Sequence, residues 1–525
     1  MKGLLREELP WLSVLTLLCL LLYLPCLGNR DLWGSVEPQY AEVAREALAD
    51  GHWLVPHYNG EVYTIKPPLY PWLIALVSIP AGDVTEFTAR LPSALSALGM
   101  VLIVYLLGKD IFGRRVGLLA ALILASSPNF YKSACMVRID MPLALFTTAS
   151  LAAFYVAFSH SKNNYYLLGW FFAALTALTK GPLGPLIIAL TISLYLYSTK
   201  KHTTFIEEHG IVLGACIFVA TIMAWLVPAY MQEGKDYLYH MLGWIREYAT
   251  GRISKEGLFY YVQILLGVGF GPAALLIPVA IYSFYKNNVE GLRLPLIWFV
   301  VVLLVLTIIP GKHSRYLLLL YPAIALLAAV PVDSYLTKSV PMSTWPAIKT
   351  FPVLLLGAIV GLGITLMESH QLPHPNVSLA LSAVFLVTGM YFALRASQFH
   401  LIFGTIFLML IVFGVSRYQF FLPKENEKNS EKALCQNIVN SMEPGATWAV
   451  YKNFRPSYPF YTKTYPRIFH KKEDALGFLS LNERVYCLIP SEHFNELSAF
   501  VTVVARLEGK GGTELILASN RPGNG

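Results

Sequence analysis

Two carboxylates and several basic residues stand beside long apolar runs of this sequence, and their types suit the binding of a phosphate group. The carboxylates are Glu37 in DLWGSVEPQY and Asp140 in MVRIDMPLALF. The principal basic residues lie between the runs and are Lys66, Arg246, Lys312 and Arg315. Lys and Arg bind phosphate oxygens through charge-assisted hydrogen bonds, and a neighbouring carboxylate can act as a general base. Ionisable residues at a membrane boundary are costly and are therefore functional candidates.

Most of these residues also have a purely structural interpretation. Glu37 precedes the helical pattern PQYAEVAREALAD, where the helix dipole favours an acidic residue. Asp140 is followed by Pro142, which is an ordinary helix start. Lys66 precedes two prolines that stiffen the backbone, but a Lys at a membrane boundary also snorkels towards the surface. The motif GKHSRY ends at Tyr316. Its basic residues lie on the outer side, where the positive-inside rule predicts few of them, so anion binding is favoured there.

The elements that must position these residues are membrane-spanning helices. Only 14% of the 525 residues are charged and the mean hydropathy is +0.53, whereas soluble chains carry about 25% charged residues. The net charge of +8 resides mainly in short loops, so topology explains it better than a nucleic-acid partner does. About thirteen apolar runs approach the length of a spanning helix, at 11–27, 91–108, 116–134, 141–158, 165–179, 182–198, 210–230, 260–284, 294–310, 315–332, 350–367, 376–394 and 401–420.

The distribution of basic residues orients this bundle. The first run lacks a clear cleavage site and is predicted to be a retained helix rather than a signal peptide. A cytoplasmic N-terminus leaves most loop Lys and Arg residues inside, as the positive-inside rule predicts. The C-terminus is then outside. The candidate residues, together with Glu42, Arg138 and Lys180, all fall at the outer face.

The sequence predicts two domains. Residues 1–422 form an all-α polytopic membrane bundle, and its outer segment 28–90 contains interfacial helices at about 38–50 and 67–80. Residues 423–525 are polar and alternate between strand-like and helix-like patterns, which predicts a small extracytoplasmic α/β domain.

No metal site is predicted from cysteine or histidine spacing. Cys435 and Cys487 lie in the polar region and could pair as a disulfide if that region is extracytoplasmic. His370 and His374 have helical spacing, but two prolines close to them argue against a helix.

Four motifs resemble those of a known family. The stretch from DLWGSVEPQY to YTIKPPLYPWLIAL resembles the first outer loop of the aminoarabinose (4-amino-4-deoxy-L-arabinose) lipid A transferases, relatives of the protein O-mannosyltransferases within the GT-C type. MVRIDMPLALF, ALTKGPLGPLI and GKHSRYLLLLYP match in order and spacing. The resemblance implies a glycosyltransferase of the bacterial inner membrane, with a periplasmic C-terminus. It would transfer a sugar with inversion from an undecaprenyl-phosphate-linked donor to a lipid A, glycan or protein acceptor. No cofactor is predicted, and a divalent metal is an alternative that the motifs do not support.

The resemblance also assigns residues. The family's second-loop Asp, its KPP lysine and two loop tyrosines fall on Asp140, Lys66, Tyr40 and Tyr63. Its first-loop acidic pair falls on Val36 and Glu37, so one acid of that pair is absent. Ile65 stands where the aminoarabinose enzymes often have an acid before the lysine, so a zinc site is not predicted to transfer.

The resulting hypothesis is a donor phosphate held by basic residues and an acceptor oriented by a carboxylate. The phosphate ligands are Lys66 and Arg315, with Lys312 or Arg246; the carboxylate is Asp140 or Glu37; and the substrate contacts are Tyr40, Tyr63 and Tyr316. The rival class is a polytopic lipid or solute transporter or flippase, which predicts inverted repeats and midplane charge. A catalytically inactive scaffold is a third alternative, because Val36 replaces an acid.

Overall fold

The computed structural model describes residues 2–160, 163–200, 210–250, 257, 259–265, 270, 274, 276–287, 289–309, 311–337 and 426–521. Four described helices are long and apolar enough to cross a membrane, at Glu86–Phe112, Asp140–His160, Ile211–Gly243 and Glu290–Ile308. The predicted helical membrane body is therefore confirmed, but the predicted number of spans is not. The candidate spans 350–367, 376–394 and 401–420 lie outside the described residues.

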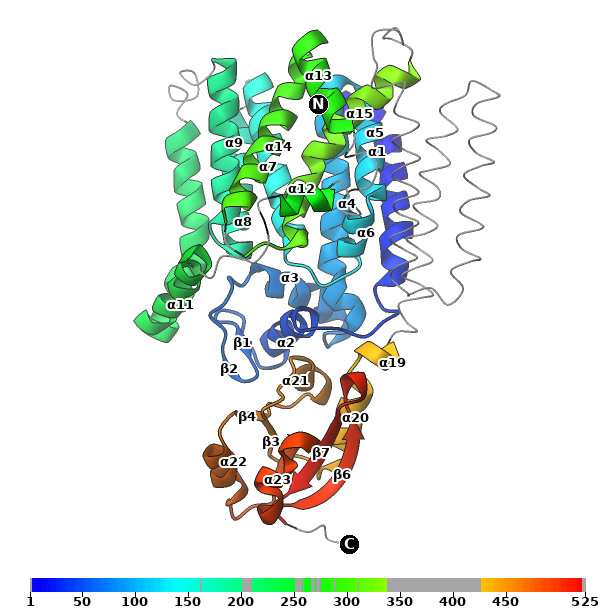
Figure 1. Ribbon diagram of the computed structural model, residues 1–525. Coiled ribbons are helices and arrows are strands. Elements are labelled where there is room, and N and C mark those ends of the chain that lie inside the picture. Colours follow the sequence, from blue (N-terminus) through cyan, green and yellow to red (C-terminus); the bar gives the residue numbers. More distant parts are fainter. Residues whose placement is uncertain are drawn as a thin grey trace, which may run out of the picture. The chain divides into compact units, whose positions relative to one another are not determined.

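The chain divides into two compact units, each built from several segments. The first comprises Met1–Cys26, Thr64–Leu69 and Pro92–Tyr418, and the second comprises Leu27–Tyr63, Tyr70–Leu91 and Gln419–Gly525. The helices of the first unit are α1 (Lys2–Tyr23), most of α4 (Glu86–Phe112), α5 (Arg114–Ser126), α6 (Pro128–Ala134), α7 (Asp140–His160), α8 (Asn163–Lys180), α9 (Leu183–Thr199), α11 (Gly210–Thr250), α12 (Tyr260–Ile264), α13 (Ile277–Asn287), α14 (Arg293–Ile308) and α15 (Tyr321–Leu336) (Figure 1).

Several apolar runs predicted as single spans are divided in the structure. The run 116–134 becomes α5 and α6, because Ser127 before Pro128 has ψ 125° and a residue before proline avoids the helical region. The described part of the run 260–284 contains α12 and α13, and 315–332 becomes the 3₁₀ turn η6 (Ser314–Leu319) followed by α15. Helix α11 extends well beyond 210–230, with a break at Gly234 where φ is 76°, a conformation that glycine adopts without steric cost.

The packing of α7 and α8 positions the candidate site. These two helices are consecutive and joined by a short connection, so the first residue of α7 and the last residue of α8 lie at the same end of the pair. The turn η6 also packs against α7. Residues from three separate motifs are thereby brought together within the first unit.

The second unit contains the outer segment and the C-terminal region. The outer segment forms α2 (Val36–Ala49), the hairpin of β1 (His57–Tyr58) and β2 (Glu61–Val62), and α3 (Leu69–Ser78), of which Leu69 is assigned to the first unit. The helical patterns predicted at 38–50 and 67–80 are confirmed as α2 and α3. The C-terminal region binds this segment directly, since Tyr461 Oη accepts a hydrogen bond of 2.8 Å from the Leu32 amide.

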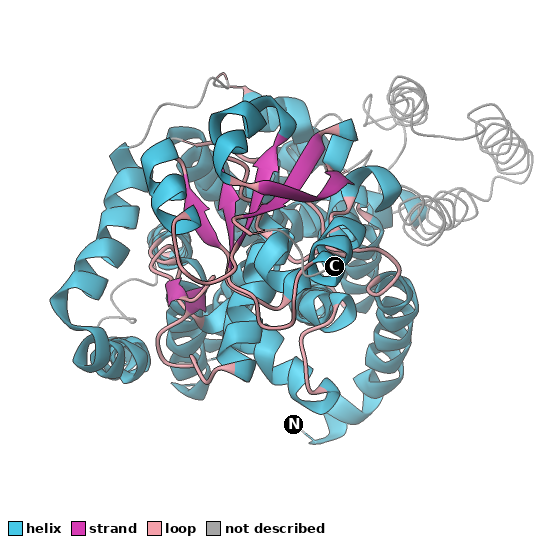
Figure 2. Cartoon of the chain, turned by 90° about the horizontal axis from the view of Figure 1, so that it is seen from below, coloured by secondary structure: helices cyan, strands magenta, loops and turns pink. Residues whose placement is uncertain are grey.

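The C-terminal region contains a five-stranded mixed sheet in the order β4-β3-β5-β7-β6 (Figure 2). Its strands are β3 (Trp448–Tyr451), β4 (Arg467–Phe469), β5 (Tyr486–Pro490), β6 (Thr502–Glu508) and β7 (Glu514–Ser519), and its helices are α19 (Asn426–Asn429), α20 (Lys432–Ser441), α21 (Ser457–Thr462), α22 (Lys472–Leu479) and α23 (Phe494–Leu497). Strand β3 is parallel to β4 and β5, whereas β7 is antiparallel to β5 and β6.

The possible disulfide of the C-terminal region is not formed. Cys435 and Cys487 are both buried free thiols. Cys487 packs with Ala449 and Tyr451, whereas Cys435 packs with Trp448 and Val450. Alternate residues of a strand point to opposite faces, so the two thiols lie in the cores on opposite faces of the sheet.

Candidate active site

A buried ion pair forms the centre of the candidate site in the first unit. Asp140 is the first residue of α7 and Lys180 is the last residue of α8. Lys180 Nζ donates to Asp140 Oδ1, and the two side chains are only 5% and 3% exposed. The loop before Asp140 is held by Ser93, whose hydroxyl accepts a 3.1 Å hydrogen bond from the Arg138 amide. This buried pair fixes the carboxylate in one position.

The turn η6 adds a second cation and an aromatic ring. Arg315 Nε lies 3.6 Å from Asp140 Oδ2, and this buried nitrogen has no hydrogen-bond partner among the residues that the structure describes. The Tyr316 ring lies beneath both cations, with Lys180 Nζ 4.0 Å and Arg315 Cζ 5.9 Å from its centroid. A cation over an aromatic face is attracted by the ring quadrupole. Tyr316 therefore helps to hold two like charges close together.

Lys66 belongs to the same electrostatic cluster. The pKa of Lys66 is lowered to about 6, first by burial and then by the charges of Lys180 and Arg315, while the charge of Asp140 opposes the shift. The pKa of His313 is also lowered, first by burial and then by the charge of Arg315. In both cases burial is the largest cause of the shift, and neighbouring positive charges add to it.

The cluster has more positive than negative charge. Lys66, Lys180 and Arg315 interact with Asp140, and Arg138 adds its charge to the same field. In the described part of the chain, the ion pairs of this cluster contain one carboxylate, that of Asp140. Burying unbalanced charge is costly, so the arrangement suits an incoming anion such as a phosphate.

The other predicted phosphate ligands are Lys312 and Arg246. Lys312 Nζ donates to the Gly257 carbonyl oxygen over 3.0 Å. Arg246 lies in α11, and its side chain is outside the part of the chain that the structure describes.

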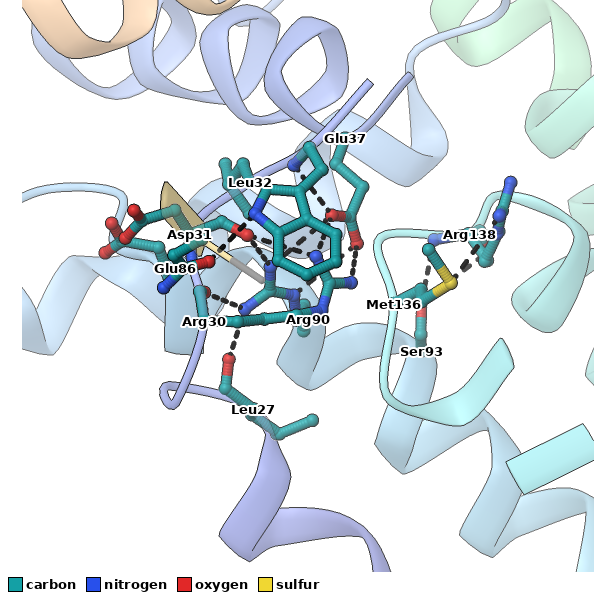
Figure 3. A network of polar contacts seen from close by, with 12 residues as sticks. Leu27, Arg30, Asp31, Leu32, Glu37, Glu86, Arg90, Ser93, Met136 and Arg138 are labelled. Atoms are coloured by element: carbon teal, nitrogen blue, oxygen red, sulfur yellow. Dashed lines mark hydrogen bonds and ion pairs between the residues drawn. The ribbon is translucent and has the colours of Figure 1, made fainter. Parts of the chain in front are cut away.

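Glu37 occupies a different environment, in the second unit (Figure 3). It is 2% exposed and accepts two hydrogen bonds from Arg30, of 2.8 and 2.9 Å. Arg90 Nη2 lies 3.4 Å from the same carboxylate. Arg90 also donates to three backbone carbonyls, those of Leu27, Arg30 and Asp31. These contacts give Glu37 a clear role in holding the outer segment.

The two loop tyrosines predicted to contact substrate are close to one another. Tyr63 hydrogen-bonds to Tyr40, and burial raises the pKa of Tyr63 well above its usual value. The Tyr40 ring also meets Tyr70 edge-on, with 5.2 Å between the centroids. Both tyrosines belong to the second unit.

Sequence reasoning did not select Lys180 as a site residue, although it was recognised as a basic residue at the outer face. Two signals were available. Lys180 ends an apolar run on the side where the positive-inside rule predicts few cations, and it lies in TKGPLGP, where Gly181 has a φ of 77°. Its partner is 40 residues away in the sequence, so the pairing itself was not visible.

The comparisons with known proteins decide the family. A family model described as dolichyl-phosphate-mannose-protein mannosyltransferase matches residues 65–227. An undecaprenyl phosphate-α-4-amino-4-deoxy-L-arabinose arabinosyl transferase of Pectobacterium carotovorum is 30% identical over 430 residues, which cover 77% of this chain and 75% of the relative. The chain belongs to this aminoarabinose transferase family.

Other relatives align over shorter parts of their length. An uncharacterised protein of Aquifex aeolicus is 28% identical, with 61% of this chain and 64% of the relative aligned. An aminoarabinose transferase of Proteus mirabilis is 30% identical, with 60% of this chain and 58% of the relative aligned. These two alignments therefore span less than two thirds of the relatives.

A solved structure gives the fold. ArnT of Cupriavidus metallidurans, solved with bound undecaprenyl phosphate, superposes with a TM-score of 0.80 at 18% identity, with 98% of each chain covered. The predicted GT-C type of fold is confirmed at this level. Membership of the aminoarabinose transferase family also favours the predicted glycosyltransferase over the transporter or flippase.

Proposed function

We propose that this protein transfers a sugar from an undecaprenyl-phosphate-linked donor to an acceptor at the outer face of the membrane. The observation that carries the proposal is the excess of cations around Asp140, the one carboxylate in the described ion pairs of this cluster. The relatives are named for a 4-amino-4-deoxy-L-arabinose donor, which is the first sugar to test, ahead of mannose or a similar pentose or hexose. The acceptor is a lipid A, a glycan or a protein.

In this proposal Lys66 and Arg315 bind the donor phosphate. When the bond between the sugar and the phosphate oxygen breaks, negative charge grows on the leaving polyprenyl phosphate. Fixed cations in a site of low dielectric stabilise that charge more in the transition state than in the ground state. Lys312 and Arg246 are proposed to extend the phosphate site.

Asp140 is the carboxylate that we propose to position or deprotonate the acceptor. It is held by Lys180 and Arg315. A bound phosphate would compete for these two cations, which weakens their hold on Asp140 and makes the carboxylate available to an acceptor. Glu37 remains the second candidate, but its paired hydrogen bonds with Arg30 favour Asp140. Tyr40, Tyr63 and Tyr316 are proposed substrate contacts.

The proposed topology places this site in the periplasm. It requires a bacterial inner-membrane bundle of about thirteen spans, with a cytoplasmic N-terminus and a periplasmic C-terminus. Labelling of single cysteines in a cysteine-free background tests the orientation. A thiol reagent that does not cross membranes should label Glu473→Cys in intact cells with a permeabilised outer membrane, but label Lys286→Cys only after lysis. The reverse pattern would refute the topology.

The activity is tested with purified full-length protein and defined lipid-linked sugars. Wild-type protein should release undecaprenyl phosphate and form a glycosylated acceptor. Asp140→Asn and Lys66→Met should lose this transfer, whereas Lys286→Met, which changes a lysine remote from the site, should retain it. Transfer that survives in both site variants would remove the proposed site, and movement of intact lipid across vesicles without transfer would favour the transporter.

A further inference from the structure

The histidine of the GKHSRY motif, His313, has no place yet in the proposed transfer reaction. It immediately precedes η6 and belongs to the first unit, as Asp140 and Lys180 do. Its ring meets the Tyr316 ring edge-on, with 5.4 Å between the centroids. Lys180 Nζ lies 4.0 Å from the centroid of the same tyrosine ring. The imidazole of His313 therefore borders the ion-pair cluster around Asp140.

The backbone fixes the position of this histidine and leaves its ring accessible. The His313 amide donates to the Tyr261 hydroxyl oxygen over 3.3 Å, and the His313 carbonyl oxygen accepts from the Tyr316 amide over 3.1 Å. Among the residues that the structure describes, neither ring nitrogen of His313 has a hydrogen-bond partner, and the residue is exposed. A ring nitrogen is therefore available to a bound ligand.

The groups that surround His313 keep its ring neutral in the donor-free protein. Burial is the largest cause of the lowered pKa of His313, followed by the charges of Arg315 and Lys180. The charge of Asp140 opposes this shift, and that of Arg138 adds to it. Because the ordinary pKa of a histidine is about 6.5, the imidazole carries no proton charge at neutral pH. It adds nothing to the excess of cations in the cluster.

The proposed transfer changes the charge of the phosphate. In the donor the phosphate is a diester with one negative charge. When the bond between the anomeric carbon of the sugar and the phosphate oxygen breaks, both electrons remain on that oxygen. The acceptor oxygen bonds to the anomeric carbon and loses its proton to Asp140 or to water. Polyprenyl phosphate leaves as a monoester, whose second ionisation has a pKa of about 6, so it gains a second negative charge that the donor lacks.

We propose that His313 is a further catalytic residue, which takes up a proton from solvent as this second charge develops and donates a hydrogen bond to the leaving phosphate. The inference rests on the proposed function. A histidine suits this task because it is neutral beside Arg315 and Lys180 before the reaction and becomes charged when an anion approaches it. Lys66 and Arg315 thus bind the first charge of the phosphate, and His313 responds to the second.

Binding of the product tests this inference without turnover and without a known acceptor. The probe is undecaprenyl phosphate at about pH 7.5, where most of it carries two charges, and the comparison ligand is its methyl ester, a diester with one charge. Calorimetry of the full-length protein in buffers of different ionisation enthalpy gives the number of protons taken up. On binding undecaprenyl phosphate, His313→Gln should take up fewer protons than wild type, by up to about one per chain. It should also bind this lipid about tenfold more weakly, whereas both proteins should bind the methyl ester alike.

The controls separate this role from a structural one. His313→Gln should keep the melting temperature of wild type, and His470→Gln, which changes an exposed histidine of the second unit, should bind both lipids as wild type does. The inference is overturned if His313→Gln retains the full proton uptake, because another group then takes the proton. It is also overturned if the variant binds both lipids more weakly by the same factor. The proposed function fails separately, if wild type binds undecaprenyl phosphate but transfers no sugar.

Discussion

The pairing of Asp140 with Lys180 yields a prediction that separates stability from catalysis. Asp140→Asn leaves Lys180 buried and unpaired, and Lys180→Met leaves the carboxylate with Arg315 alone. Removing one partner of a buried ion pair costs about 3–5 kcal/mol. The remaining attraction between Arg315 and Asp140 at 3.6 Å is ~5 kcal/mol at an effective dielectric constant of about 20. Lys180→Met should therefore be the milder of the two single substitutions.

The double variant Asp140→Asn/Lys180→Met should be more stable than Asp140→Asn alone, because neither a buried cation nor its partner remains. A coupling energy of about 2–3 kcal/mol is expected for residues in direct contact. Sugar transfer should stay absent in the double variant, since the carboxylate is missing. Melting temperatures of all four proteins in detergent, together with the transfer assay, provide the measurement.

Two results would refute this reasoning. If the double variant melts at or below the temperature of Asp140→Asn, the two side chains are not coupled in the folded protein. If the double variant regains stability and also regains transfer, Asp140 serves only to neutralise Lys180 and has no role towards the acceptor.

Three further predictions concern other parts of the chain. Because the pKa of Lys66 is about 6 in the donor-free protein, donor binding above this pH should take up a proton. The affinity for the donor should therefore fall with rising pH, by at most about tenfold per pH unit. Calorimetric titrations should show this dependence in the wild type and not in Lys66→Met. Arg90→Met removes three hydrogen bonds to carbonyls and one ion pair. The substitution should destabilise the protein by about 3–5 kcal/mol and expose the outer segment to proteolysis. Arg90→Lys should not restore the stability of the wild type. Tyr461→Phe removes the acceptor of the Leu32 amide and should lower the free energy of unfolding by about 1–3 kcal/mol, as measured by thermal unfolding. An unchanged stability would show that this contact does not tie the C-terminal region to the outer segment.

Local patterns predicted the helices of the outer segment and the mixed character of the C-terminal region. The helical pattern PQYAEVAREALAD predicted α2, and the strand-like and helix-like patterns after residue 423 predicted the α/β structure found there. Interruptions within the apolar runs were harder to foresee. Hydropathy does not register that Ser127 must leave the helical region before Pro128, or that Gly234 breaks a long helix. Composition therefore predicted the membrane body but not the boundaries of its helices.

The interpretation of Glu37 shows where spacing alone is insufficient. Its position before α2 was compatible with a catalytic carboxylate and with a helix start. The partners that distinguish these roles are Arg30 and Arg90, and Arg90 is 53 residues away in the sequence. Only the folded chain shows that both guanidinium groups converge on this carboxylate.

The most informative sequence signal was a basic residue on the side of the membrane where basic residues are rare. Such a residue lacks the attraction of anionic cytoplasmic lipids, so another interaction must offset its desolvation. Lys180 and Arg315 both obtain this interaction from Asp140, and one carboxylate does not balance these two cations. A substrate that carries its own negative charge would complete the balance. The positive charge that makes the empty site unfavourable is thus the same charge that would select a phosphate-linked donor over a neutral sugar.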